Sequence, residues 1–435
     1  MLPVNPGGHA AYQNFVATNL RKYYPNPDAF SPATWDIIER FWNLDLSYTD
    51  DLLRSKYSVF DPKPRTPSCM QRSYLLSIDF KIHSLTDWAA QLKINPLYAI
   101  LSGFEFGDTP GVGTFYDFLS RLWDSEDSNL SSHLRPAKEK RIKKPTQKGA
   151  KAESVEKVSV DQLLGQLEAA SFVLDDQPYS SLFKIYHREF LSQSITKGLI
   201  DPSVLSLAGD GTPVVTSARE RKHPASKHDS LGFLETWFRM KAFLPDLHVS
   251  KWLLDSAHDA MPYYIYCRKN HIQPFIDLNV KRGIKVKYKN DFTIGEDGVP
   301  VCKAGRKMRH DGSEPSKKRL KFRCPLASRK YGCSCTHPCS DSKYGRTVHL
   351  AMKDNPRLIN FPPRDTKEWK KEFNARTSAE RSNKREKIGF QLESGRHRST
   401  KMWYCRLYHI MMLQHLDAWD LPFESPLRKL ILEVA

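Results

Sequence analysis

The spacing of apolar positions predicts helices in the first third of the chain. Apolar side chains recur every three or four residues in residues 32–43, 85–92 and 114–123, which is the period of a helix with one buried face. Four tryptophans fall in these segments, and we expect them in a hydrophobic core. They are Trp35, Trp42, Trp88 and Trp123. This pattern predicts a mostly helical amino-terminal domain.

Further along, two helix-like segments precede three short apolar runs that each end in an aspartate. The helices are predicted at residues 160–172 and 179–195, and the aspartates are Asp210, Asp255 and Asp277. A short apolar run closed by an acid and a turn is typical of a buried strand. An aspartate in such a place can be a metal ligand, or only a turn former or helix cap.

Residues 373–387 are predicted to form a helix with one carboxylate among cations. At about 100° per residue, Phe373, Arg376, Glu380 and Lys387 fall in a narrow stripe on one face. Such a stripe suits a metal ion that handles a phosphate, because the acid can bind the cation while the bases hold phosphate oxygens. The alternative is a solvated helix in which Glu380 only pairs with a cation four residues away.

The order aromatic, Arg, Glu and Lys at this spacing resembles the Tyr-Arg-Glu-Lys signature of bacterial insertion-sequence DDE transposases, with Phe373 in place of the tyrosine. That family also has two upstream aspartates, each at the end of a strand of an RNase H-like domain. Asp210 and Asp255 match these two positions in the family's order, and Glu380 follows them. The resemblance covers residues 204–387.

The resemblance implies an α/β protein with an RNase H-like catalytic domain that carries an inserted Cys-rich basic segment. The implied activity is metal-dependent DNA strand cleavage and strand transfer in cut-and-paste transposition. Asp210, Asp255 and Glu380 would bind two Mg²⁺ or Mn²⁺ ions about 3.5–4 Å apart. The residues expected to contact DNA are Phe373, Arg376, Asn383 and Lys387.

Two further aspartates compete with Asp255 for the second position. Asp259 is expected to cap the helix that follows it or to lie in its first turn, and it is an alternative ligand. Asp277 ends the next strand-like segment and is a weaker alternative.

The charge of the chain agrees with a nucleic-acid enzyme. There are 67 Lys and Arg against 49 Asp and Glu, a formal net charge of +18. Such an excess attracts phosphates without regard to sequence, although ribosome-associated and membrane-surface proteins are basic too. Two basic runs, residues 303–330 and 367–401, flank the predicted acidic site, as a DNA-cleaving groove requires.

Composition and pattern divide the chain into five segments. These are a helical DNA-binding domain (1–133), a basic disordered linker (134–158), the first part of the catalytic domain (159–282), the Cys-rich insertion (283–346) and the last part of the catalytic domain (347–435). The linker is rich in Lys and Arg and has almost no large apolar residue. A final helix at residues 402–416 is expected to pack on the sheet.

Five of the eight cysteines lie in the insertion. Among so many cations they suggest zinc ligands more than disulfides, although the paired Cys-x-x-Cys spacing of a clear zinc site is lacking. The expected ligands are Cys302, Cys324, Cys333 and Cys339, with Cys335 or His337 as substitutes. The alternative is a basic loop with reduced cysteines. The insertion has three tyrosines and no tryptophan, so a base-flipping or hairpin step has no support.

Two other functions stay open. One is a catalytically silent, transposase-derived DNA-binding protein. The other is a zinc-stabilised RNA-binding or ribosome-associated protein, which leaves the order of the acids unexplained. The expected partners are double-stranded DNA and further copies of the chain, as a homodimer or larger synaptic complex. The start of the chain lacks a signal-peptide pattern and no apolar run approaches about 18 residues, so we expect a cytoplasmic protein.

Overall fold

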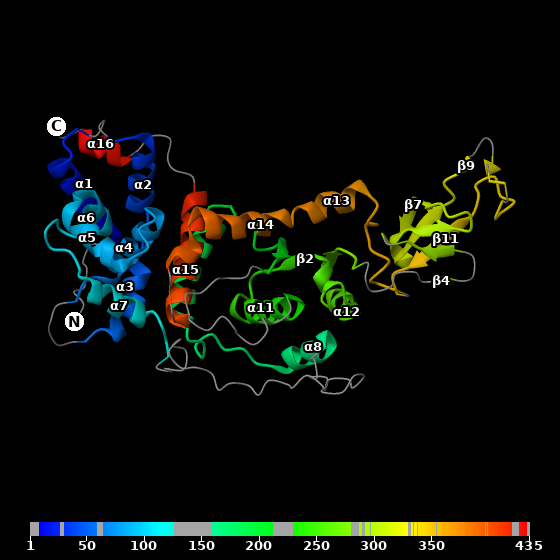
Figure 1. Cartoon of the computed structure of the whole chain (residues 1–435), viewed down its shortest axis with the longest axis horizontal. Coiled ribbons are helices and arrows are strands. Elements are labelled where there is room, and N and C mark those ends of the chain that lie inside the picture. Colours follow the sequence, from blue (N-terminus) through cyan, green and yellow to red (C-terminus); the bar gives the residue numbers. More distant parts are fainter. Residues whose placement is uncertain are drawn as a thin grey trace, which may run out of the picture.

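The structure is a computed structural model of the whole chain. The residues it describes are 8–26, 30–58, 64–125, 159–211, 229–279, 287–288, 292–295, 297–328, 332–333, 335–336, 338–353, 355–395, 397, 399–419 and 426–432. The predicted basic linker, residues 134–158, lies outside them. The described chain is mixed α/β, as predicted, with a helical end, a parallel sheet in the middle and a β-rich end (Figure 1).

The amino-terminal part is helical, as the apolar spacing predicted. Its helices are α1 (Gly8–Tyr23), α2 (Pro32–Trp42), α3 (Ser47–Leu53), α4 (Pro67–Asp79), α5 (Leu85–Ile94), α6 (Pro96–Ser102) and α7 (Val112–Arg121). Proline stands in the first turn of α2, α4 and α6, where its missing N–H costs nothing. The four predicted core tryptophans are all buried, in one cluster shared by these helices.

The end of the chain returns to this helical part. Helices α15 (Thr400–Ala418) and α16 (Pro426–Leu432) bury apolar residues in the same core, among them Ile410 and Leu413 at 0% exposure. Figure 1 shows α16 against the first helices and α15 at their border with the sheet. The prediction that the final helix packs on the sheet is therefore wrong, because its apolar face completes the amino-terminal core.

A continuous helical run leads from the amino-terminal part to the sheet. It consists of α9 (Ser180–Ile185), the π-helical turn η4 (Tyr186–Leu191) and α10 (Ser192–Thr196), close to the predicted residues 179–195. Short 3-10 turns occur elsewhere in the described chain. They are η2 (Arg54–Lys56), η5 (Ser256–His258), η7 (Pro315–Lys317) and η9 (Leu392–Gly395).

Three parallel strands form the central sheet in the order β1-β2-β3. They are β1 (Leu205–Gly209), β2 (Val249–Leu254) and β3 (Gln273–Ile276). Parallel neighbours need a crossover, and α11 (Asp229–Phe243) and α12 (Met261–Lys269) provide helices between successive strands. All three predicted strands are therefore present, each followed by its predicted aspartate.

Helices cover both faces of this sheet. Successive side chains of a strand point to opposite faces, so neighbours in β2 show what packs on each face. Trp252 and Leu254 pack in a cluster with α11, α12 and α8 (Val160–Ala169). Leu253, between them, lies in a different cluster with Trp369 of α13 (Lys367–Asn374). The central strand β2 is thus buried on both faces of the sheet at its carboxyl end, where Trp252, Leu253 and Leu254 lie.

A separate β-rich lobe contains the predicted insertion and extends past its boundary at 346, because β11 pairs with β8; its core includes Leu320, Phe322 and Leu350. One sheet has the order β4-β5-β6, another β11-β8-β7, and β9 pairs with β10. The strands are β4 (Lys287–Tyr288), β5 (Phe292–Ile294), β6 (Pro300–Cys302), β7 (Arg309–Glu314), β8 (Arg319–Arg323), β9 (Ala327–Ser328), β10 (Gly332–Cys333) and β11 (Thr347–Ala351).

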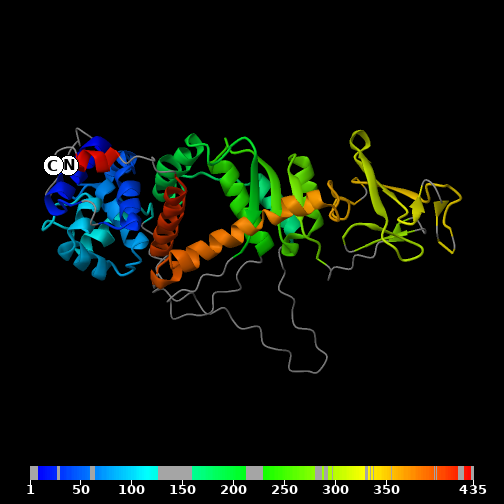
Figure 2. The ribbon, with the colours of Figure 1, turned by 90° about the horizontal axis from the view of Figure 1, so that it is seen from above.

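After the insertion, the chain runs back past the sheet toward the amino-terminal helices (Figure 2). This return consists of α13, α14 (Thr377–Lys384) and a π-helical turn, η8 (Arg385–Gly389). The single helix predicted for residues 373–387 is therefore split, with a turn at Ala375 and Arg376 and a wider π turn at its end.

Candidate active site

The carboxyl ends of the three parallel strands carry the predicted aspartates. The last residues of β1 and β3 both pair with Leu254, the last residue of β2. The residues that follow are Asp210, Asp255 and Asp277, so all three leave the sheet at the same edge. Ligands of open parallel sheets bind at this edge, outside the carboxyl ends of the strands. Asp277 is thus as well placed along the edge as Asp210, on the other side of Asp255.

A cavity of about 360 Å³ lies at this edge beside β1. Asp210 lines it, and so does the buried ring of His258, whose Nδ1 lies 2.7 Å from Oδ1 of Asp255. Asp255 also accepts a hydrogen bond from the backbone N–H of Ala257 at 3.0 Å, so it caps the turn η5 as well. The cavity therefore brings Asp210 together with the Asp255–His258 pair. His258 was not among the residues predicted from the sequence, although it stands three residues after Asp255.

Gly209 allows close packing next to Asp210. A Cβ atom at this position would lie 2.6 Å from the ring of Phe233 on α11 and 2.7 Å from the side chain of Leu254. Real Cβ atoms do not approach so closely, so only glycine lets α11 lie against the end of β1. The glycine thereby fixes where Asp210 leaves the sheet.

Asn383 connects α14 to the strand ends. Its side-chain Nδ2 donates a hydrogen bond to Oδ2 of Asp210 at 3.0 Å. Glu380 lies three residues earlier on the same helix, and residues three apart are neighbours on a helix surface. The structure thus brings Glu380 to within one helical turn of a residue that touches Asp210.

The carboxylate of Glu380 is engaged by Arg376. Nη2 of Arg376 lies 2.5 Å from Oε1 of Glu380, and the Glu380 side chain is 49% exposed. This ion pair between residues four apart on a helix is the alternative to a metal site that the sequence allowed. The exposed cations Arg381 and Lys384 follow on the same helix.

The other two members of the predicted stripe have different surroundings. Phe373 packs against Trp369, with ring centroids 4.7 Å apart, and belongs to a small core cluster on the sheet. Lys387 lies in the π turn η8 and pairs with Glu393 at 3.3 Å. A π turn does not keep the 100° step from which the stripe was predicted, so the four residues do not share one face.

Asp259 has a structural role. Its buried carboxylate accepts hydrogen bonds from Nε and Nη2 of Arg357, and further ones from the hydroxyl of Tyr264 and the backbone N–H of Asn279. Ala260, not Asp259, caps α12, so the predicted capping role is wrong. These partners leave Asp255 as the better candidate for the second position.

Divalent cations fit the chemistry of Asp210 and Asp255. Carboxylate oxygens are the ligands that Mg²⁺ prefers, and both side chains reach solvent, Asp255 with 39% exposure. Among the residues that the structure describes, no group of three or more His, Cys, Asp or Glu side chains is placed to hold one metal ion. Glu380 would have to leave Arg376 to join the other two acids.

The described cysteines of the insertion form no disulfide, and some of them lie close together. Cys302 and Cys339 line one cavity of about 50 Å³, together with Arg346. Cys324 is buried nearby, and its backbone N–H bonds the carbonyl oxygen of Arg346 at 2.9 Å. The side chain of Cys333 lies outside the described residues. Three of the four predicted zinc ligands thus lie in one region of the insertion.

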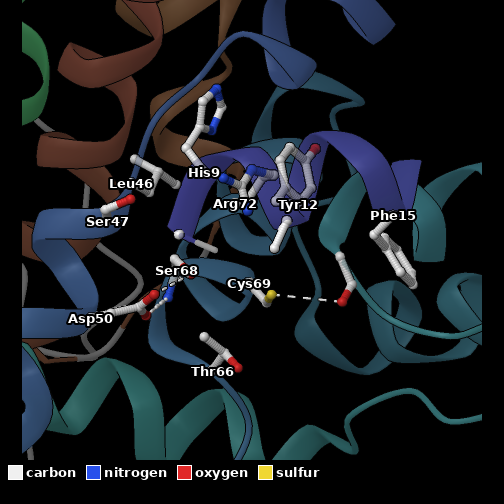
Figure 3. Close-up of a pocket in the computed structure, with 13 residues that line it drawn as sticks. His9, Tyr12, Phe15, Leu46, Ser47, Asp50, Thr66, Ser68, Cys69 and Arg72 are labelled. Carbon is white, nitrogen blue, oxygen red and sulfur yellow. Dashed lines mark hydrogen bonds between the residues drawn. The ribbon is translucent and has the colours of Figure 1, made fainter. Parts of the chain in front are cut away.

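A separate cavity of about 220 Å³ lies in the amino-terminal part, between α1, α3 and α4 (Figure 3). The guanidinium of Arg72 stacks on the ring of Tyr12 there, 3.5 Å from its centroid, and Asp50 accepts hydrogen bonds from Ser68. Burial raises the pKa of the Cys69 thiol in its wall to about 11. These side chains hold the helices together, and none belongs to the predicted catalytic set.

Known proteins give no family for this chain. Comparison with protein families, with curated proteins and with solved structures finds no match. Within the described chain, the helices are too short or too polar to cross a bilayer.

Proposed function

We propose that the chain is a DDE transposase that cleaves and joins DNA strands with divalent metal ions, on an RNase H-like core. The catalytic acids are Asp210, Asp255 and Glu380. The single observation that carries this proposal is the meeting of β1, β2 and α14. Asp210 and Asp255 follow paired strand ends, and Asn383 of α14 bonds Asp210 at 3.0 Å. Asp210 and Asp255 thus leave the sheet at one edge, and Glu380 lies one helical turn from a residue that touches Asp210, which supports a shared site.

The residues around the acids have positioning roles. Asn383 orients the Asp210 carboxylate, and His258 orients that of Asp255. Their hydrogen bonds leave further lone pairs on each carboxylate for a cation. Arg381 and Lys384 are exposed on α14 and would contact the phosphates of bound DNA.

Arg376 would change partners when DNA binds. In the structure it holds Glu380 at 2.5 Å. A phosphate oxygen can replace the carboxylate as acceptor, because guanidinium binds both groups with the same geometry. Glu380 would then be free to join Asp210 and Asp255. Divalent ions bound by the three acids would activate the attacking oxygen and stabilise the leaving oxygen of the phosphodiester.

Strand cleavage of DNA that flanks this gene tests the proposal. The protein is incubated with a labelled duplex of that DNA and Mg²⁺, and nicked products are separated on a denaturing gel. We expect cleavage by the wild type and none by Glu380→Gln, while both bind the duplex. Glu372→Gln is the matched control, because Glu372 lies on α13 and pairs with Lys251. Cleavage that survives Glu380→Gln, or is equally lost in the control, would contradict the proposal.

The second candidate is a silent, transposase-derived DNA-binding protein. The Arg376–Glu380 pair favours it, as does the absence of a three-carboxylate group among the described residues. In that case the wild type and Glu380→Gln bind the flanking duplex equally, and neither cuts it at any Mg²⁺ or Mn²⁺ concentration.

A further inference from the structure

A basic groove lies between the insertion and the central sheet. It has a volume of about 720 Å³ and is lined by the β7–β8 hairpin, the chain after β11 and the start of β3. Gln273 and Pro274, the first residues of β3, form part of its wall. Asp277 follows the other end of this strand. At about 3.3 Å per residue, the groove is about 13 Å from the acidic edge. It is therefore a separate site.

Cations dominate the lining of this basic groove. Five Lys or Arg side chains line it against two glutamates. The cations are Arg268, Lys317, Lys318, Arg319 and Lys353, and the acids are Glu314 and Glu368. Glu314 is already paired with Lys317 and Arg319. In the part of the chain that the structure describes, the other three cations form no ion pair. The groove thus presents uncompensated positive charge, which suits an anionic ligand.

An exposed aromatic ring stands in the same groove. Phe361 is 45% exposed and lines the groove beside Pro274 and Met352. Its backbone oxygen accepts a hydrogen bond from Nε2 of Gln273 at 2.6 Å, which ties this segment to the sheet. A large apolar ring left open among cations suits a ligand with both phosphates and flat bases.

We propose that the basic groove binds an unpaired stretch of DNA, with one base stacked on Phe361 and its phosphates on Arg268, Lys318 and Lys353. A hollow of this volume accepts a few nucleotides, whereas a duplex is too wide and keeps its base faces covered. That the strand is DNA rests on the proposed function. The groove would hold a strand separated from its complement while another segment lies at the acidic edge.

Binding of short labelled oligonucleotides to the full chain tests this proposal. Fluorescence anisotropy compares a 12-nucleotide DNA of mixed sequence, the same sequence as RNA, and a matching duplex. We expect Arg268→Glu/Lys353→Glu to weaken single-stranded DNA binding roughly 10-fold or more and to lower its salt dependence. Phe361→Leu keeps an apolar side chain but removes the ring, and we expect roughly 5-fold or greater weakening.

The control is Lys241→Glu/Lys269→Glu, which changes the same charge on α11 and α12 outside the groove. It should alter binding less than 2-fold, and circular dichroism confirms that every variant is folded. Unchanged single-strand binding in both groove variants would overturn the proposal. Equal losses for strand and duplex, or tighter binding of RNA than of DNA, would overturn it too. Glu380→Gln should bind normally, so a failure of the catalytic proposal would leave this result unaffected.

Discussion

The side-chain amide of Asn383 connects α14, the helix that carries Glu380, to Asp210 at the end of β1. If Asn383 positions Asp210 for a metal ion, Asn383→Ala should lower the rate of Mg²⁺-dependent strand cleavage by about 10–100-fold, with DNA affinity unchanged. The rate is measured under single-turnover conditions over a range of Mg²⁺ concentrations. We expect more Mg²⁺ to restore part of the lost rate.

Asn374→Ala provides the comparison for this change. Asn374 is the last residue of α13 and is exposed, so its removal should leave the rate within about 2-fold of the wild type. Equal rates for Asn383→Ala and Asn374→Ala would show that the bond to Asp210 has no part in cleavage.

A second residue-scale prediction concerns Glu189, which is buried in η4 and bonded to the backbone N–H and hydroxyl of Thr49. Burial raises its pKa to about 8. Because the folded state then holds this proton more tightly than the unfolded state, stability is greatest below about pH 4.5 and falls as pH rises toward 8. Glutamine has no charge, and it can keep both contacts because its amide oxygen accepts from the Thr49 N–H while its amide NH2 donates to the Thr49 hydroxyl.

We therefore expect Glu189→Gln to stabilise the protein at pH 8 by on the order of 4 kcal/mol and to have little effect near pH 4.5. Urea denaturation of both proteins at several pH values measures the difference in the free energy of unfolding. A constant difference across this pH range would show that Glu189 titrates normally.

At the scale of elements, the spacing of apolar and acidic residues predicted those helices and strands that depend on short stretches of sequence. The three strands of the sheet and their closing aspartates were predicted, because an apolar run ended by an acid is a short-range signal. The helix over residues 373–387 was predicted as one piece, although it breaks at Ala375 and Arg376 and widens at η8. The sequence there contains no proline or glycine before Gly389, so no local signal marked the break.

Contacts between residues far apart in the chain could not be predicted from the sequence. Asp259 is bonded to Arg357, 98 residues later, and no spacing rule links two such positions. The same limit explains why the final helix was assigned to the sheet. Its apolar spacing predicted that one face is buried but carried no information on which partner covers it.

The insertion gives an element-scale prediction about zinc. If Cys302 and Cys339 are ligands, the purified protein should contain about one zinc per chain, and Cys339→Ser should lose it. Zinc is measured with a colorimetric chelator after unfolding. Cys267→Ala, in the buried face of α12, is the control and should keep the metal. Absence of zinc from protein expressed with added zinc would favour the reduced basic loop.

At the scale of the whole molecule, α15 contacts both the amino-terminal helices and the segment that returns past the central sheet. Asp417, near its end, accepts hydrogen bonds from Arg40 of α2 and from Arg385 of η8. Helix α15 thereby touches both the amino-terminal core and η8, which directly follows the helix that carries Glu380. The amino-terminal helical part and the part that contains the central sheet should therefore not unfold independently at this border.

This arrangement predicts which elements lose stability when a buried residue of α15 is replaced. Leu413 is fully buried in the amino-terminal core, so Leu413→Ala should lower the free energy of unfolding by about 2–5 kcal/mol. Hydrogen exchange should show the largest loss of protection in α4 and less in β2. The reverse order, with β2 exposed first, would show that α15 packs on the sheet in solution.

The central proposal is that Asp210, Asp255 and Glu380 serve one metal centre. Iron-directed cleavage measures this directly: Fe²⁺ replaces Mg²⁺ in the protein bound to flanking DNA, and locally generated radicals cut the backbone beside the ion. We predict cuts near residues 210, 255 and 380 together, all suppressed by excess Mg²⁺ and all lost in Asp210→Asn. Cuts near 210 and 255 without 380, or no cuts at these places, would contradict a common centre.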